Sequence, residues 1–140
     1  MKKPRIAVLG ATGVVGRHIL EIMEELKISY ESIKLLSSAK SAGSRLNFDG
    51  IEYIVEEAKP SSFDDVDIVL ASAGASTSKK FAPEIVKRGG LIIDNSSAFR
   101  MEEQVPLVIA GVNDDDLKDH AGIIANPNCS TSQLILALRS

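Results

Sequence analysis

The chain has 140 residues, of which 44% are hydrophobic and 25% are charged, and its formal net charge is −3. This composition is typical of one globular domain and lacks the basic stripe and aromatic platform that nucleic-acid binding uses. We expect no membrane span, which needs about 20 consecutive apolar residues, and no signal peptide, because a strand begins almost at the N-terminus. A single cysteine excludes an internal disulfide, so we expect a cytoplasmic protein.

Short apolar runs alternate with amphipathic segments along the whole chain, a pattern that predicts strands joined by crossover helices. Most of the runs show no polar alternation, as is typical of strands covered on both faces. We therefore expect an α/β fold with a doubly wound, mostly parallel sheet of the Rossmann type. Its predicted strands are Ile6–Leu9, Ile33–Ser37, Ile68–Ser72, Leu91–Asp94, Leu107–Ala110 and Ile123–Ala125.

The segments between these runs predict helices and one hairpin. Apolar residues at helical spacing predict helices over Val14–Leu26, Lys79–Arg88 and Ser130–Leu138. Apolar residues also alternate on either side of Asp49-Gly50, which favours a type I′ turn and hence a small antiparallel hairpin excursion. Four aspartates between positions 114 and 119 predict a short solvated helix, and no histidine pattern beside them supports a metal site. No linker or repeat divides the chain, so we expect residues 1–140 to form one domain.

A glycine loop, Gly10 to Gly16, follows the first strand and leads into the first helix. In a dinucleotide-binding loop, Gly10 would permit the tight turn, Gly13 would let a pyrophosphate approach the backbone, and Gly16 would let the helix pack on the strand. The N–H groups of residues 13–15 would then face the anion along the helix dipole. The spacing is G-x-x-G-x-x-G rather than G-x-G-x-x-G, and a role in packing alone remains an alternative.

The end of the second strand indicates which dinucleotide is bound. An acidic residue about 20 positions after the loop would bind the ribose 2′-hydroxyl and repel a 2′-phosphate. The segment 37–41 reads Ser-Ser-Ala-Lys-Ser and contains no acid, so it predicts NADP rather than NAD, with a plain surface turn as the alternative. The loop Ser72–Thr77, which is rich in small residues, follows another strand and would leave room for the cofactor.

Cys129 lies between a strand and the first turn of the C-terminal helix. A thiol there is next to N–H groups and the positive end of the helix dipole, which stabilise a thiolate and an oxyanion. The alternative is a small buried hydrophobic residue, which the polar neighbours make less favourable. Arg100 follows the fourth strand, at the same edge of the sheet, where it would bind an oxyanion or form a surface ion pair. Neither His18 nor His120 is placed as a base for this cysteine.

Five strings, GATGVVG, SAKSAG, SAGAST, IDNSSAFRM and ANPNCSTSQ, occur in this order. Together they closely resemble bacterial aspartate-β-semialdehyde dehydrogenases, and the resemblance extends over all 140 residues. It implies an enzyme that reduces β-aspartyl phosphate with NADPH, giving aspartate semialdehyde and phosphate on the route to lysine, threonine and methionine. One departure is Ala110-Gly111, where the family commonly has Pro-Glu.

The resemblance also assigns residues. Cys129 would be the nucleophile that forms a thioacyl enzyme, and Arg100 and Asn128 would bind the substrate phosphate. The residues expected to bind the cofactor are Gly10, Thr12, Gly13, Val14, Val15, Gly16, Ser38, Lys40, Ser41, Ser72, Ala73 and Gly74.

The family's general-base histidine and most of its dimer contacts belong to a second domain, which would follow residue 140. We therefore expect the chain to be an N-terminal fragment that binds NADP but is essentially inactive, within a parent enzyme that is a homo-oligomer. One alternative is an N-acetyl-γ-glutamyl-phosphate reductase, which tends to have an aromatic residue where this chain has Ser130. The other alternative is an NADP-binding module without catalysis.

Overall fold

The computed structural model describes residues 2–139. Its main sheet has six strands in the order β5-β2-β1-β6-β7-β8, and every neighbouring pair is parallel. These strands are β1 (Arg5–Leu9), β2 (Ser32–Ser37), β5 (Glu56–Glu57), β6 (Ile68–Ala71), β7 (Leu91–Asp94) and β8 (Ile123–Ala125). The predicted doubly wound α/β fold of the Rossmann type is confirmed.

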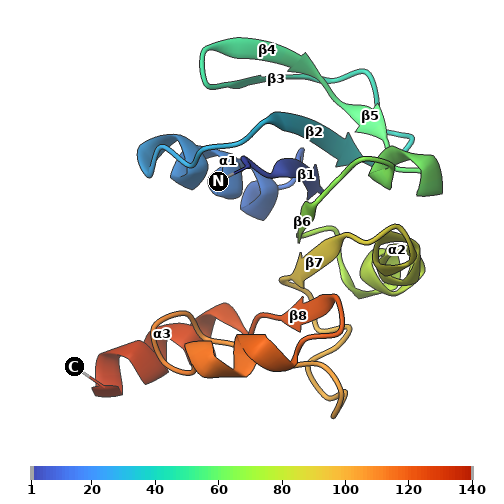
Figure 1. Ribbon diagram of the computed structural model, residues 1–140. Helices are drawn as coiled ribbons and strands as arrows, with labels where there is room; N and C mark the ends of the chain where they lie inside the picture. Colours follow the sequence, from blue (N-terminus) through green and yellow to red (C-terminus); the bar gives the residue numbers. More distant parts are fainter. Residues whose placement is uncertain (1, 140) are drawn as a thin grey trace.

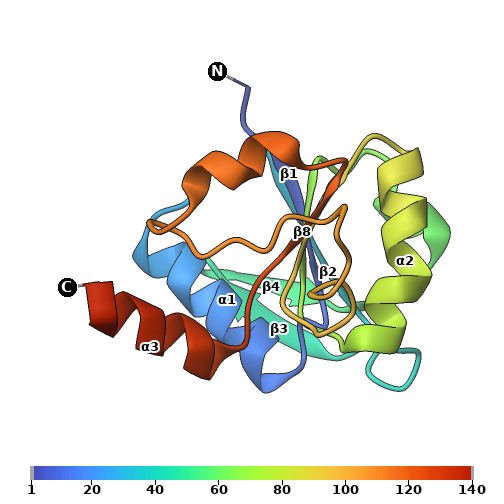
Figure 2. The same ribbon diagram turned by 90° about the horizontal axis from the view of Figure 1, so that it is seen from below.

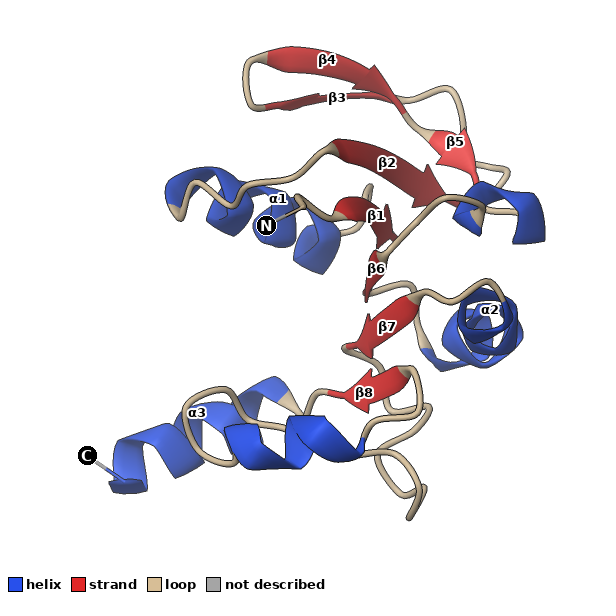
Figure 3. Ribbon diagram, in the orientation of Figure 1, coloured by secondary structure: helices blue, strands red, loops and turns tan. Residues whose placement is uncertain are grey.

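Helices cover both faces of this sheet (Figure 1). Seen along the sheet edge, α2 (Ala75–Lys87) lies on one face, and α1 (Val14–Glu25) and α3 (Cys129–Arg139) lie on the other (Figure 2). Two 3₁₀ helices, η1 (Pro60–Phe63) and η2 (Asp114–Asp119), lie in the connections. The alternation of strands and helices along the chain is visible in Figure 3. None of the helices in residues 2–139 is long and apolar enough to cross a bilayer.

Two hydrophobic clusters, one on each face, hold these layers together. The cluster under α2 contains Phe63 and Phe81, whose ring centroids are 5.3 Å apart. The cluster under α1 contains Met23 and also includes residues of the hairpin. Neighbouring residues of β1 enter opposite clusters, Ala7 the first and Val8 the second. Both faces of β1 are thus buried, which explains its unalternated apolar sequence.

The predicted hairpin is confirmed as a separate two-stranded sheet of β3 (Arg45–Phe48) and β4 (Ile51–Ile54). Its turn residues Asp49 and Gly50 have φ values of 53° and 74°, as a type I′ turn requires. The hairpin packs Leu46 and Phe48 into the cluster under α1, on the β2 side of the main sheet.

The predicted strand Leu107–Ala110 is wrong. The segment makes a single parallel bridge, between Leu107 and Ala125. The side chain of Asn113 takes over the backbone partners that a ladder would have used: it accepts the N–H of Ile109 at 2.8 Å and donates to the carbonyl of Leu107 at 2.9 Å. The edge of the sheet beside β8 is therefore covered by an irregular loop.

Other boundaries also differ from the prediction. The helix expected over Lys79–Arg88 begins at Ala75, directly after Gly74, which has a φ of 92°. The apolar pattern placed the start of this helix too late because its first turn consists of small, mostly polar residues. The two-residue strand β5 was missed because it is too short to show a period. The short aspartate-rich helix is confirmed as η2, and the C-terminal helix is confirmed as α3.

Candidate functional site

The three glycines of the loop after β1 differ in how much space the structure leaves for a side chain. A Cβ on Gly10, which has a φ of +91°, would lie 2.9 Å from the backbone nitrogen of Ala73. A Cβ on Gly16 would lie 2.1 Å from the carbonyl oxygen of Gly10. Gly13 has a φ of −73° and is exposed, and the nearest atom to its Cβ would be 3.4 Å away. Packing within the chain thus requires Gly10 and Gly16 but leaves the space beside Gly13 open.

Two helix N-termini come together at this edge of the sheet. Gly13 precedes α1 and Gly74 precedes α2, and neither helix has a side-chain cap within the described residues. Because β1 and β6 are neighbouring parallel strands, the helices that follow them begin at the same edge. The first-turn N–H groups of a helix need partners, and the local potential is positive, so this edge favours an anionic ligand.

A cavity of about 500 Å³ lies between the glycine loop, the ends of β2 and β6, and α2. This volume is within the range of small-molecule sites. Of the predicted cofactor-binding residues, those that line the cavity are Gly10, Thr12, Gly13, Ser38, Ser41, Ser72 and Ala73. The others, which do not line it, are Val14, Val15, Gly16, Lys40 and Gly74. The structure therefore brings together the backbone and hydroxyl groups of three loops, and the side chain of Lys40 stays exposed outside the cavity wall.

Hydrogen bonds hold these loops to one another. The hydroxyls of Thr12 and Ser37 are 2.8 Å apart and join the glycine loop to the end of β2. The hydroxyl of Ser72 donates to the carbonyl of Leu9 at 3.4 Å, which joins the loop after β6 to β1. These bonds fix the positions of the loops that form the cavity walls.

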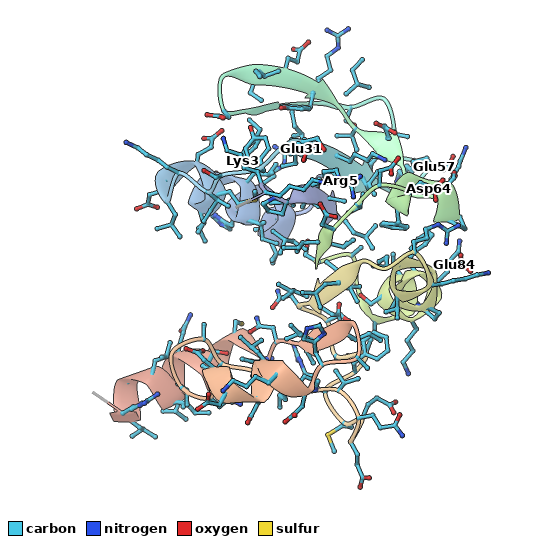
Figure 4. The ribbon with its side chains drawn as sticks, in the orientation of Figure 1. Lys3, Arg5, Glu31, Glu57, Asp64 and Glu84 are labelled. Carbon is cyan, nitrogen blue, oxygen red and sulfur yellow. The ribbon has the colours of Figure 1, made fainter. Side chains whose placement is uncertain are left out.

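Several lining residues were missed by the sequence analysis. Thr77, Lys80 and Phe81 come from α2. Their spacing of three and four residues places them on one face of that helix. The sequence analysis put Thr77 in a loop and Lys80 and Phe81 in the following helix, so it did not bring the three onto one face. Glu57, the last residue of β5 and labelled in Figure 4, also lines the cavity, and its carboxylate lies 3.2 Å from the ammonium group of Lys59.

A second group of predicted residues lies after β8. Cys129 is the first residue of α3 and is exposed. The side-chain oxygen of Asn128 accepts the N–H of Ser130 at 2.9 Å, and its carbonyl accepts the N–H of Ser132 at 3.0 Å. Asn128 thus caps the helix that carries the thiol.

Arg100 is held against the same segment. Its Nε donates to the carbonyl of Asn126 at 2.9 Å, and its Nη2 donates to the carbonyl of Asn95 at 3.2 Å. The side chain of Asn126 donates to that of Asn95 at 2.7 Å and ties the loops after β7 and β8 together. A guanidinium carries five N–H donors, so Arg100 keeps donors for a ligand beyond the two used by carbonyls of the described chain.

Arg100, Asn128 and Cys129 do not line the cavity. The predicted site thus has two parts at one edge of the sheet: a preformed cavity at β1, β2 and β6, and a polar group at β7 and β8. These two parts lie along consecutive strands of the sheet.

The histidines lie elsewhere. His18 is exposed on α1, with its Nδ1 2.8 Å from the carboxylate of Glu21. The Nδ1 of His120 accepts the N–H of Gly122 at 3.0 Å. Within residues 2–139, no group of three or more His, Cys, Asp or Glu side chains is arranged to hold a metal ion.

Groups with clearly shifted pKa values also lie outside the cavity. Hydrogen bonds from the Arg5 side chain hold the pKa of the Asp67 carboxyl well below its usual value, and the same pairing raises the pKa of Arg5. Burial, together with a hydrogen bond to Asp49, raises the pKa of Tyr30. These pairs join the amino-terminal ends of β1 and β6 and anchor the hairpin turn, so their role is structural.

Comparison with known proteins identifies the family. Residues 5–120 match the family model described as "Semialdehyde dehydrogenase, NAD binding domain". The chain belongs to the semialdehyde dehydrogenase family. Among its relatives in this family, the aspartate-semialdehyde dehydrogenase of Bacillus subtilis is 53% identical over 133 residues, which are 95% of this chain and 38% of the relative. That of Aquifex aeolicus is 50% identical over 138 residues, 96% of this chain and 41% of the relative.

Solved structures of aspartate-semialdehyde dehydrogenases have the same fold. Aspartate semialdehyde dehydrogenase II from Vibrio cholerae matches with a TM-score of 0.94 and 37% identity, covering 98% of this chain and 42% of that one. The enzyme from Candida albicans, solved with NADP, matches with a TM-score of 0.74 and 28% identity, covering 96% of this chain and 45% of that one. This semialdehyde dehydrogenase NAD-binding domain therefore spans about two fifths of the length of these relatives.

Proposed function

We propose that this chain is the NADP-binding domain, residues 1–140, of an aspartate-semialdehyde dehydrogenase acting on β-aspartyl phosphate. The observation that carries the proposal is the cavity, where an uncapped helix N-terminus and the open face of Gly13 meet the hydroxyls of Ser38 and Ser41. The C. albicans structure with NADP supports this assignment. The glycine loop would bind the pyrophosphate through backbone N–H groups.

The two serines would bind the 2′-phosphate. The end of β2 carries no carboxylate that would bind the ribose 2′-hydroxyl and repel a 2′-phosphate, which supports NADP over NAD. Glu57 also lines the cavity, but its charge is offset by Lys59 at 3.2 Å, and Lys80 adds a cation from α2. Lys80 would therefore supply a cation from the cavity wall, whereas Lys40, the cation predicted from the sequence, lies outside that wall.

The proposed chemistry takes place at the β7–β8 group. NADP, when bound, supplies the exchange of a hydride with the substrate. Cys129 loses its proton to a base and attacks the acyl carbon as a thiolate. A carbon–sulfur bond forms as the carbon–oxygen bond to the phosphate breaks, so phosphate leaves with the electron pair of that bond. Arg100, fixed by two backbone carbonyls, binds the phosphate, and Asn128 supports it while capping the helix that carries the thiol.

The 140 residues by themselves would bind the cofactor and turn over little. His18 pairs with Glu21 on the exposed surface of α1. His120 precedes β8 whereas Cys129 follows it, so the two lie at opposite ends of that strand, and we assign neither histidine to Cys129 as a base. We assign the base, the substrate carboxylate site and the oligomer contacts to a second domain in the parent enzyme. Steady-state reduction of NADP by this chain, at the roughly 1 to 10³ per second of complete enzymes, would contradict this part of the proposal.

A charge substitution in the cavity wall tests the cofactor assignment. Ser41→Asp places a carboxylate at the proposed 2′-phosphate site, and repulsion of about 1 to 4 kcal/mol predicts a loss of NADP affinity of about fivefold or more. NAD, which has no 2′-phosphate, would lose much less. Ser29→Asp adds the same charge before β2, at the opposite end of that strand, and is the matched control. Equal losses for NADP and NAD in titrations of Ser41→Asp would refute the assignment.

A further inference from the structure

Asp94, the last residue of β7, carries a completely buried carboxylate and does not line the cavity. Its Oδ1 accepts the hydroxyl of Ser78 at 2.5 Å and the N–H of Ser96 at 3.2 Å. Its Oδ2 accepts the hydroxyl of Ser96 at 2.7 Å. Burial of a carboxylate is costly unless it is hydrogen-bonded, and these three donors satisfy it.

The partners of Asp94 belong to both parts of the site. Ser78 lies in α2, next to Thr77, which lines the cavity. Ser96 lies in the loop that leads to Arg100, and its hydroxyl oxygen also accepts the N–H of Ala98 at 3.1 Å. The carboxylate thus fixes the start of this loop against the helix beside the cavity.

Asp94 is also hydrogen-bonded to the two segments whose carbonyls hold Arg100. The carbonyl of Asn95, which accepts Nη2 of Arg100, lies between Asp94 and Ser96, the two residues joined by the carboxylate. The carbonyl of Asn126 accepts Nε of Arg100, and the N–H of Asn126 donates to the carbonyl of Asp94 at 2.8 Å. The carboxylate of Asp94 thus holds the turn that carries the Asn95 carbonyl, and the backbone carbonyl of Asp94 holds the segment that carries the Asn126 carbonyl.

We propose that Asp94 is a positioning residue for Arg100, which it aims at the anion site beside Cys129. This inference rests on the proposed function, because it takes Arg100 to be the phosphate-binding group. In Asp94→Asn, one acceptor oxygen becomes an NH₂ donor, and the size of the side chain is kept. The bonds to Ser78 and Ser96 are then no longer charge-assisted, and one serine hydroxyl must accept where it now donates. The network weakens, the loop loosens, and the charge of Arg100 moves away from Cys129.

The rates at which the thiol is alkylated test this proposal. Cys129 is the single cysteine of the sequence, so alkylation of the intact chain reports on that position alone. The ratio of the rate with iodoacetate, an anion, to the rate with neutral iodoacetamide measures the local positive charge. The proposal requires the guanidinium to lie within about 10 Å of the thiol, and at that range Arg100→Met should lower this ratio about twofold or more at low ionic strength.

Asp94→Asn should lower the ratio in the same direction. A purely electrostatic effect would do the opposite, because the substitution removes a negative charge and would raise the ratio. In an Arg100→Met background, Asp94→Asn should add no further decrease, since the effect passes through Arg100. Asp119→Asn, which changes an exposed carboxylate of η2, is the matched control.

The outcomes distinguish the positioning role of Asp94 from the assignment of Arg100 as the phosphate-binding group. If Arg100→Met lowers the ratio but Asp94→Asn leaves or raises it, the positioning role is refuted and the assignment of Arg100 stands. If Arg100→Met itself has no effect, the proposed phosphate site is refuted, and the positioning role fails with it. If Asp94→Asn does not fold, Ser96→Ala removes a single hydroxyl of the same network and should also lower the ratio, and an unchanged ratio there would refute the proposal.

Discussion

Gly16 is the position at which the glycine loop tolerates a side chain least. A Cβ there would lie 2.1 Å from the carbonyl oxygen of Gly10 and 2.9 Å from the Cα of Ala11. Both contacts are with backbone, and the Gly10 carbonyl also accepts the N–H of Gly13 at 3.1 Å. The substitution Gly16→Ala therefore requires the first turn of α1 to move away from the end of β1.

The size of this effect follows from two opposing contributions. Overpacking a site by a methyl group costs about 1 to 3 kcal/mol, and a rigid backbone neighbour places this case at the upper end. Replacing glycine by alanine inside a helix returns about 1 kcal/mol. The expected net loss is about 2 kcal/mol, or a fall in Tm of roughly 4 to 8 °C for a domain of this size.

Thermal unfolding followed by circular dichroism measures this loss, with Gly13→Ala as the control. At Gly13 the nearest contact would be 3.4 Å away and φ is −73°, so stability should change by less than about 1 kcal/mol. NADP binding should weaken in Gly13→Ala, because the added methyl group occupies the open face beside the cavity. Equal stability of Gly16→Ala and the unaltered chain would refute the packing argument, and unaltered NADP binding by Gly13→Ala would refute the role of the open face.

Two further predictions concern stability away from the cavity. Phe63→Ala should cost about 3 to 5 kcal/mol in urea unfolding, because its ring is buried against Phe81 at 5.3 Å, and a loss below 1 kcal/mol would show that the cluster collapses around the gap. The pairing with Arg5 holds the pKa of Asp67 below its ordinary value of 3.8, so this carboxylate stabilises the fold above that pH, and the stabilisation is lost as the pH falls through the lower, native pKa. Asp67→Asn should therefore lower the urea midpoint at pH 7 and weaken its decline below about pH 4; an unchanged midpoint at pH 7 would contradict this role.

The fold could be predicted from the sequence because local and global signals agree in most of the chain. The unalternated strand Arg5–Leu9 is buried on both faces, and Asp49-Gly50 marks the hairpin turn without ambiguity. The segment 107–110 has the same apolar character, yet the side chain of Asn113 captures its backbone groups. A side-chain competitor of this kind, four to six residues farther along the chain, is not visible in a pattern of hydrophobic residues.

The candidate site was predictable to a smaller extent. The loops after β1, β2 and β6 carry glycine and serine signals, and their residues meet in one cavity. Lys80 was missed because it contributes through the packing of α2, and Asp94 because a strand-end acid looks like an ordinary surface residue until its burial is known. The position of Arg100 was predictable from topology, but the carbonyls that fix its orientation come from the tertiary fold alone.

The central claim, that this domain binds NADP through the cavity at the ends of β1, β2 and β6, is tested most directly by calorimetric titration of the chain with NADP and with NAD. We predict one NADP site per chain and an affinity for NADP at least tenfold higher than for NAD, which corresponds to about 1.4 kcal/mol. Equal affinities for the two cofactors, or no binding of either one, would contradict the claim.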